Sequence, residues 1–196
     1  MHRLPNILSG IRILLAPIFL VLFFQDNFIL KAIGLAVYIV AAITDYYDGY
    51  FARKYKVYSD FGAFLDPLAD KFLTFSGFVV LPFIAVEQFP WWAIILIIIR
   101  DTVITALRVY MKRRKVSMVT RFTAKIKTTI QMIFLYIGLA VGLFQGLDFF
   151  VGVWVEWILS TDILFYLMLF VTTVTVYSGL EYLYVNRGVF KAPSSK

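Results

Sequence analysis

Four aspartates are the residues whose types and spacing point most directly to chemistry. They lie at or just beyond the ends of long apolar stretches, at positions Asp45, Asp48, Asp66 and Asp70. A carboxylate at membrane depth costs several kcal/mol, so it marks a functional site by default. Two like charges ~4 Å apart repel by about 4 kcal/mol at an effective dielectric of ~20, and carboxylates that gather therefore need cations. The pattern predicts a site for divalent metal ions with oxygen ligands.

Two helices are needed to position these acids. Asp45 and Asp48 are three residues apart, whereas Asp66 and Asp70 are four residues apart. Both spacings place a pair of side chains on one face of an α-helix. The sequence therefore predicts two helices that each present two carboxylates to a shared site.

Composition indicates that this site is built into a membrane protein. Hydrophobic residues make up 61% of the chain and the mean hydropathy is +0.83, whereas soluble domains average roughly 45–50% apolar residues. Long apolar runs are typical of membrane-spanning helices. They predict an all-α integral membrane protein, a six-transmembrane-helix bundle with spans at Asn6–Phe24, Lys31–Thr44 (helical through Arg53), Gly62–Val86, Trp91–Tyr110, Ile126–Phe144 and Ile163–Val185. Residues 1–190 are expected to form one domain, and residues 191–196 a disordered tail.

The distribution of charge predicts how the bundle is oriented. The net charge is +7, and most Lys and Arg lie at the N-terminus, in residues 53–56 and 108–127, and in the C-terminal tail. By the positive-inside rule, these parts face the cytoplasm, as expected for a multi-pass protein of the cell (inner) membrane. The aspartates open on the same side. The basic loops have two interpretations: they set the orientation and attract anionic lipid headgroups, or they attract an anionic substrate. No nucleic-acid partner is expected.

The opposite side of the bundle is marked by tryptophans. Trp91 and Trp92 begin one apolar run, and Trp154 and Trp157 lie before another, as expected for an outer interfacial belt. The interrupted segment 146–160 is too short to span and is expected to lie along this interface. Cysteine is absent, which excludes disulfides and thiolate metal sites.

Polar stripes in the fourth and fifth apolar runs predict a cavity that reaches from the cytoplasmic surface towards the middle of the bilayer. One stripe follows the spacing of a helix face and contains Asp101, Thr105, Arg108 and Lys112. A second stripe contains Arg121, Lys125 and Thr128. For Arg100 and Asp101 an alternative interpretation is an internal charge pair, or a side chain that reaches towards water.

The aspartates form part of a longer motif with eight specified positions, Asp45-x2-Asp48-Gly49-x2-Ala52-Arg53-x8-Gly62-x3-Asp66-x3-Asp70. At every specified position the chain resembles the signature of the CDP-alcohol phosphatidyltransferases. The resemblance implies a membrane enzyme that uses a CDP-lipid and two divalent cations, Mg²⁺ or Mn²⁺. It also implies a homodimer.

The resemblance also suggests roles for the residues of the motif. It implies metal binding by all four aspartates, with Asp70 as the base that takes a proton from the acceptor hydroxyl. The binding site for the CDP-lipid would be formed by Asp48, Gly49, Ala52, Arg53 and Gly62. The small residues leave room for the nucleotide, and Arg53 is placed to bind a phosphate or a carboxylate. The small residues also fit close helix packing, and both interpretations hold together.

Three further runs bear on the acceptor alcohol. The run Leu4-Pro-Asn-Ile-Leu-Ser-Gly-Ile-Arg12, the run Arg100-Asp-x6-Leu-Arg108 and the run Ala124-Lys-Ile-Lys-Thr-Thr-Ile-Gln131 are similar to runs of the phosphatidylglycerophosphate synthase branch of that family. Ser9, Asp101 and Ala124 stand where that branch has Thr, Glu and Gly. This resemblance implies transfer of a phosphatidyl group from CDP-diacylglycerol to glycerol 3-phosphate, with release of CMP.

Charge supports an acceptor of this kind, because glycerol 3-phosphate is a dianion and needs a basic pocket beside the metals. The candidates for binding its phosphate are Arg108, Lys125 and Lys127, with Arg113 and Arg114 as steering charges at the mouth. Inositol phosphate needs similar charge, whereas serine needs less. A cardiolipin synthase of the same family, with phosphatidylglycerol as its acceptor, is a further alternative. A divalent-cation transporter also clusters acids, but it typically shows two related halves, and this sequence shows no repeat.

Overall fold

The structure is a computed structural model that describes residues 4–55, 60–114, 118–119 and 122–187. Side chains are described within these ranges except at residues 4–9, 45–55, 60–67, 112–113 and 122. The tail expected at residues 191–196 lies outside the described residues. Two compact units divide the chain: residues 1–84 with 138–157 form unit 1, and residues 85–137 with 158–196 form unit 2.

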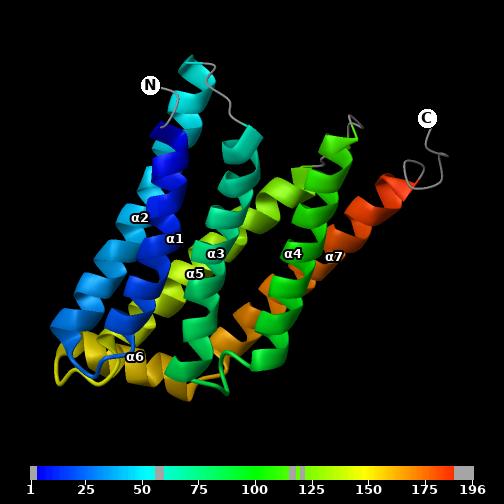
Figure 1. The fold of residues 1–196 in the computed structure, drawn as a ribbon. Coiled ribbons are helices and arrows are strands. Elements are labelled where there is room, and N and C mark those ends of the chain that lie inside the picture. The colour runs from blue at the N-terminus through cyan, green and yellow to red at the C-terminus, as the bar shows by residue number, and fades with distance from the viewer. Residues whose placement is uncertain (1–3, 56–59, 115–117, 120–121, 188–196) are drawn as a thin grey trace. The chain divides into compact units, whose positions relative to one another are not determined.

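Within the described ranges the chain forms helices joined by short connections, with no strand (Figure 1). The seven helices are α1 (Leu4–Phe23), α2 (Phe28–Tyr55), α3 (Asp60–Ile84), α4 (Trp91–Arg113), α5 (Phe122–Phe144), α6 (Phe150–Ser160) and α7 (Ile163–Val185). Each of the predicted apolar runs forms a long helix, which confirms the all-α prediction. A helix bonds its backbone N–H and C=O groups to each other, and a long apolar segment needs this wherever no water can bond them.

Local sequence explains where several of these helices begin and end. The Oδ1 atom of Asn27 accepts hydrogen bonds from the amides of Ile29 at 2.8 Å and Leu30 at 3.3 Å, which caps α2. Pro90 precedes α4, and its carbonyl accepts a bond from the Ala93 amide at 3.1 Å. Gly146 follows α5 with a φ of 77°, a left-handed conformation that favours glycine.

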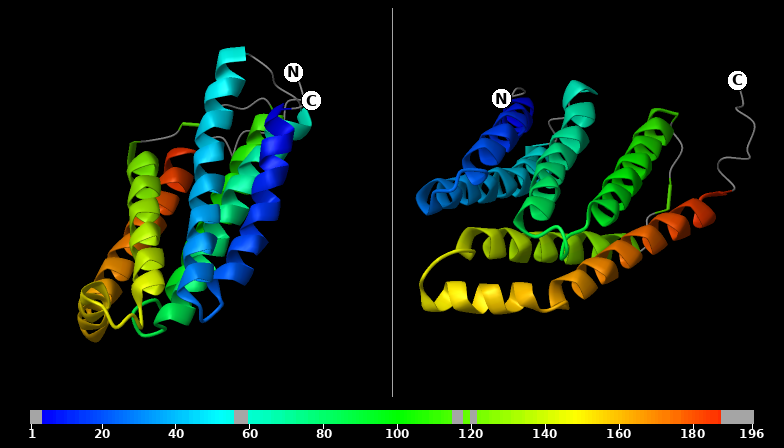
Figure 2. Two further views of the ribbon diagram at one scale, coloured as in Figure 1. Left: turned by 90° about the vertical axis from the view of Figure 1, so that its left-hand side faces the viewer. Right: turned by 90° about the horizontal axis from the view of Figure 1, so that it is seen from below.

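In unit 1, α1 packs along both α2 and α3, and α2 also contacts α3 (Figure 2). Phe19 and Tyr38 are fully buried, with ring centroids 4.8 Å apart. At Gly34 an added Cβ would lie 3.1 Å from the Leu22 Cβ, so glycine permits the close approach of α1 and α2. The helices that carry the aspartate pairs are therefore held against one common helix.

The C-terminal part of α5 also belongs to unit 1 and packs closely on α3. A Cβ at Gly138 would lie 2.6 Å from Leu81 Cδ2, and a Cβ at Gly142 would lie 2.4 Å from Ile84 Cδ1. The two glycines are four residues apart and share one helix face. Small residues at this spacing let two apolar helices approach closely.

In unit 2, α4 packs against α7. Phe89 and Phe134 are buried with ring centroids 5.8 Å apart. Gln88 donates to the Leu159 carbonyl at 3.2 Å and accepts from the Phe165 amide at 3.0 Å. These bonds tie the segment before α4 to the start of α7, so that α4 and α7 begin together.

Among the described residues, two helical segments are long and apolar enough to cross a membrane by length and composition, Thr123–Phe144 and Ile163–Val185. Large apolar side chains are exposed on several helices: Leu14 and Val21 on α1, Ile29 on α2, Phe83 on α3 and Leu180 on α7 are each more than 60% exposed. The eleven-residue helix α6 is too short to span a bilayer. Its exposed side chains include Phe150, Val153, Trp154 and Trp157.

Candidate active site

The two predicted carboxylate pairs lie on two helices that touch in unit 1. Asp45 and Asp48 are on α2, and Asp66 and Asp70 are on α3. The two helices touch, and the meeting of the four carboxylates at one shared site stays a prediction. Several predicted site residues have side chains outside the described ones: Asp45, Asp48, Gly49, Ala52, Arg53, Gly62, Asp66 and Arg113.

Asp70 is the member of the quartet whose surroundings are described. It is half-buried, between the exposed Leu68 and the buried Leu73. Its backbone carbonyl accepts a hydrogen bond from the hydroxyl of Thr74 at 2.9 Å, one turn further along α3. This bond satisfies the Thr74 hydroxyl within the helix and involves only the main chain of Asp70.

A donor set of four carboxylates suits hard divalent cations. Mg²⁺ and Mn²⁺ prefer oxygen ligands and are bound in proteins through carboxylates together with substrate phosphates. Asp45 with Asp48 supplies one pair along α2, and Asp66 with Asp70 supplies the other along α3. The chemistry of these residues therefore fits a two-cation site.

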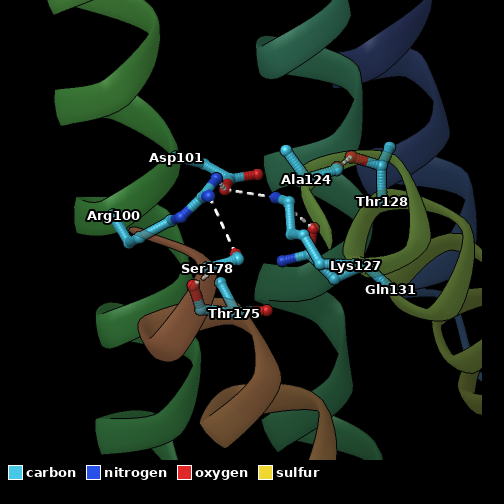
Figure 3. Close-up of polar contacts among 8 residues, drawn as sticks. All are labelled: Arg100, Asp101, Ala124, Lys127, Thr128, Gln131, Thr175 and Ser178. Atoms are coloured by element: carbon cyan, nitrogen blue, oxygen red, sulfur yellow. Dashed lines mark hydrogen bonds and ion pairs between the residues drawn. The ribbon is translucent and has the colours of Figure 1, made fainter. Parts of the chain in front are cut away.

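A second group of charged side chains is buried in unit 2, between α4, α5 and α7 (Figure 3). Asp101 Oδ1 accepts bonds from Arg100 Nη1 at 2.9 Å and Lys127 Nζ at 2.5 Å. Lys127 also donates to Gln131 Oε1 at 2.5 Å. Arg100 Nη2 donates to the Ser178 hydroxyl at 2.9 Å. We call these five residues the Asp101 cluster.

Burial makes the Asp101 cluster an internal ionic network. Asp101 is 2% exposed and Lys127 is 3% exposed, and charges this deeply buried persist only when they are paired and hydrogen-bonded. Arg100 and Asp101 thus form the internal charge pair that was one of the two interpretations of the sequence, and Lys127 extends it. A phosphate would have to enter this buried cluster to reach Lys127, whose role in acceptor binding stays a prediction.

The close approach of Arg100 to α7 depends on a glycine. A Cβ at Gly179 would lie 2.9 Å from Arg100 Cγ and 3.0 Å from Arg100 Nε. Any larger residue would push the stem of Arg100 away from α7. The glycine therefore allows the guanidinium to reach the Ser178 hydroxyl.

The other predicted acceptor-binding cations have different surroundings. Arg108 is exposed, with its guanidinium carbon 5.6 Å from the centroid of the Tyr182 ring. Arg114 is exposed and lies 4.8 Å over the ring of Tyr110. Lys125 is exposed on the first turns of α5. Arg108, Arg114 and Lys125 are therefore accessible to an anion, whereas Lys127 is not.

A stripe of polar residues along α7 was not recognised from the sequence. Its members lie three or four residues apart and are all buried: Thr175, Ser178, Tyr182 and Asn186. Polar residues at helical spacing inside an apolar run are the signal that could have found them. We call this set the α7 stripe.

The family assignment follows from comparison with known proteins. The family model for CDP-alcohol phosphatidyltransferases matches residues 2–177. The chain belongs to this family. The resemblance predicted from the aspartate motif is thereby confirmed.

Curated members of the phosphatidyltransferase family are similar over much of the chain. The CDP-diacylglycerol–glycerol-3-phosphate 3-phosphatidyltransferase of Salmonella typhimurium is 31% identical over 191 residues, which cover 95% of this chain and 96% of the relative. The Rickettsia typhi protein of the same name is 36% identical over 132 residues, 67% of this chain and 73% of the relative. A probable phosphatidylglycerophosphate synthase of Mycobacterium tuberculosis is 35% identical over 145 residues, 72% of this chain and 65% of the relative.

The extent of the family match separates two parts of unit 2. Residues of α4 and α5 lie inside the matched range, whereas the C-terminal turns of α7, with Ser178, Tyr182 and Asn186, lie beyond residue 177. Part of the α7 stripe therefore falls outside the region that the family model describes.

Proposed function

We propose that this protein transfers the phosphatidyl group of CDP-diacylglycerol to glycerol 3-phosphate, giving phosphatidylglycerophosphate and CMP. The observation that carries this conclusion is the match to the Salmonella typhimurium relative of that name along 95% of the chain. The aspartate motif and the runs around Arg108 and Lys125 support it independently, because they supply carboxylates for cations and cations for a phosphate.

The proposed reaction is a phosphoryl transfer at the motif of α2 and α3. Asp45, Asp48, Asp66 and Asp70 would hold two divalent cations, Mg²⁺ or Mn²⁺. When bound, such cations polarise the β-phosphoryl group and neutralise the departing CMP. Gly49, Ala52 and Gly62 leave space for the nucleotide beside the backbone, and Arg53 can form paired hydrogen bonds with a phosphate.

Asp70 is proposed as the base. It takes the proton of the primary hydroxyl of glycerol 3-phosphate while the hydroxyl oxygen attacks the β-phosphorus. The bond between that phosphorus and the bridging oxygen of CMP breaks, and CMP leaves with the electron pair. This displacement needs no covalent intermediate with the protein.

We propose that the acceptor phosphate is bound by the cations of α4 and α5. Arg108 and Lys125 are the leading candidates because both are exposed in the structure. Arg113 and Arg114 would steer the anion at the mouth, and the effect of such steering falls with ionic strength. Lys127 would take part through the Asp101 cluster.

The proposed setting is a six-span bundle in the cell (inner) membrane, formed by residues 1–190, with both termini and the polar cavity in the cytoplasm. Exposed apolar side chains on α1, α2, α3 and α7 support contact with lipid. The exposed Trp154 and Trp157 support a place for α6 at the outer interface. We further propose that the protein acts as a homodimer, as the family resemblance implies.

The decisive experiment measures CMP release from CDP-diacylglycerol by the purified protein with Mg²⁺ or Mn²⁺. Glycerol 3-phosphate, inositol phosphate, serine and phosphatidylglycerol are compared as acceptors. Release with glycerol 3-phosphate alone supports the proposal. Release with phosphatidylglycerol instead would indicate a cardiolipin synthase, and release with inositol phosphate or serine another member of the family. Folded protein that releases no CMP with any acceptor would refute the proposal and leave the transporter alternative.

A further inference from the structure

The α7 stripe contacts two arginines of α4, and the contacts follow the same order along both helices. Ser178 accepts a bond from Arg100, and one turn later the ring of Tyr182 lies under Arg108. Ser178 and Tyr182 are four residues apart on α7, and Arg100 and Arg108 are eight apart on α4. Two arginines of one helix are therefore held by two members of one polar stripe.

Contacts other than the one with Arg108 hold Tyr182 in place. Its side chain is 4% exposed, and its hydroxyl donates to the sulfur of Met118 at 3.2 Å. Its backbone carbonyl accepts bonds from the Asn186 amide at 3.2 Å and from Asn186 Nδ2 at 2.9 Å. A ring held at both its hydroxyl and its backbone offers a face of defined position to the guanidinium.

Asn186 links this ring to the connection between α4 and α5. The Asn186 side chain is buried and pairs with Val119 twice, accepting from its amide at 3.0 Å and donating to its carbonyl at 3.2 Å. Glu181, on the same end of α7, accepts a bond from the Thr123 hydroxyl at 2.5 Å. The end of α7 thus holds both Met118–Val119 and the first turn of α5, the helix that carries Lys125.

We propose that Tyr182 is a positioning residue that orients the Arg108 guanidinium for the phosphate of the acceptor, and that Asn186 fixes Tyr182 and the adjoining connection. This inference rests on the proposed function. A guanidinium can stack on an aromatic face, and Arg108 Cζ lies 5.6 Å from the centroid of the Tyr182 ring. The N–H groups lie in the plane of the guanidinium, where they can form paired bonds with a phosphate.

This arrangement explains how an exposed arginine serves as a binding group. A long side chain at the surface loses rotamer freedom when it binds a ligand, and a side chain that is already oriented loses less. Cation–π contacts at exposed sites correspond to about a twofold to fivefold change in an equilibrium constant. Tyr182 lies beyond the residues that the family model matches, so the orientation is supplied by a part of the chain outside the shared motif.

The test compares kinetic constants of Tyr182 and Arg108 variants of the full-length protein. Tyr182→Phe keeps the ring and removes the bond to Met118, whereas Tyr182→Leu removes the ring. We expect Tyr182→Leu to raise the KM for glycerol 3-phosphate about twofold to fivefold, with kcat and the KM for CDP-diacylglycerol unchanged. Tyr182→Phe, which keeps the ring, should leave the KM for glycerol 3-phosphate unchanged. In an Arg108→Ala background, Tyr182→Leu should cause no further rise, because the two residues act together.

A second series keeps the test valid if Tyr182→Leu fails to fold. In this series Tyr182 is replaced by phenylalanine analogues whose rings carry an increasing number of fluorine atoms. Fluorination keeps the shape of the ring but weakens the negative charge on its face, which attracts the cation. The KM for glycerol 3-phosphate should rise with fluorination, and that for CDP-diacylglycerol should not. Three results would overturn the positioning role: equal rises in both KM values, independent effects of Tyr182 and Arg108, or no response to fluorination. In each case, turnover by the wild-type protein would still uphold the proposed function. If the wild-type protein releases no CMP with glycerol 3-phosphate, the proposed function fails first, and the positioning role fails with it.

Discussion

Asp101→Asn is the substitution whose effect the structure defines most sharply. Asp101 is 2% exposed and accepts bonds from both Arg100 and Lys127, so it is the anion that balances two neighbouring cations. Asparagine keeps the size of the side chain but removes its charge. Lys127, itself 3% exposed, would then remain in a buried site without this carboxylate.

The magnitude follows from the cost of breaking a buried ion pair. Removing one partner typically costs about 3–5 kcal/mol, and asparagine, which still offers one acceptor oxygen, should fall near ~3 kcal/mol. For a chain of this length, 1 kcal/mol shifts the Tm by roughly 2–4 °C, so Asp101→Asn should lower the Tm by about 10 °C. The KM for CDP-diacylglycerol should change less than that for glycerol 3-phosphate, because the motif of α2 and α3 is untouched.

The assay is thermal unfolding of purified protein in one detergent, with two comparison variants. Asp26→Asn removes an exposed carboxylate and should stay within about 2 °C of wild type. Asp101→Asn combined with Lys127→Met removes both members of this ion pair, and should recover at least half of the lost stability because no buried ammonium is left without its carboxylate. A single variant that melts within 2 °C of wild type, or a double variant that melts no higher than the single one, would refute the reasoning.

The remaining predictions concern the motif, the acceptor site and helix packing. Asp70→Asn should abolish CMP release while the Tm stays within a few degrees of wild type, and near wild-type turnover would exclude Asp70 as the base. Arg108→Ala should raise the KM for glycerol 3-phosphate about tenfold, a loss typical of a charged hydrogen bond, with little change in the KM for CDP-diacylglycerol; equal effects on both substrates would argue against an acceptor role. Gly142→Val should lower the Tm by several degrees, because its Cβ would meet Ile84 at 2.4 Å, whereas Gly10→Val, where no atom lies within 4 Å, should have a small effect.

Much of the fold could be predicted because apolar runs and helical spacing are properties of the sequence itself. The run Ile163–Val185 coincides with α7. Differences arise where short-range hydrogen bonds set the ends: α2 begins at Phe28 rather than Lys31 because Asn27 caps it. The segment at 150–160 forms a short helix, α6, which composition alone did not define.

The candidate site divides along similar lines. The placement of the aspartate pairs on two helices could be predicted from their spacing, whereas their role in binding metal stays a prediction. The pairing of Lys127 with Asp101 could not, since it depends on which turn of α5 faces α4. The same holds for Tyr182, which reaches Arg108 only because α4 packs on α7. Interactions between helices distant in sequence leave no local pattern that a single chain reveals.

The way in which the hydroxyls of α7 are bonded has a consequence for the biogenesis of the protein. Thr172 donates to the Met168 carbonyl at 2.8 Å, Thr173 to Leu169 at 2.8 Å and Ser178 to Thr175 at 2.9 Å, all within the helix. In a nascent segment these three hydroxyls already have partners in their own helix, so they are not left unsatisfied in lipid. In the insertion that the proposed function requires, these three hydroxyls of α7 therefore do not need a partner on another helix, and Ser178 can dock with Arg100 in a later step.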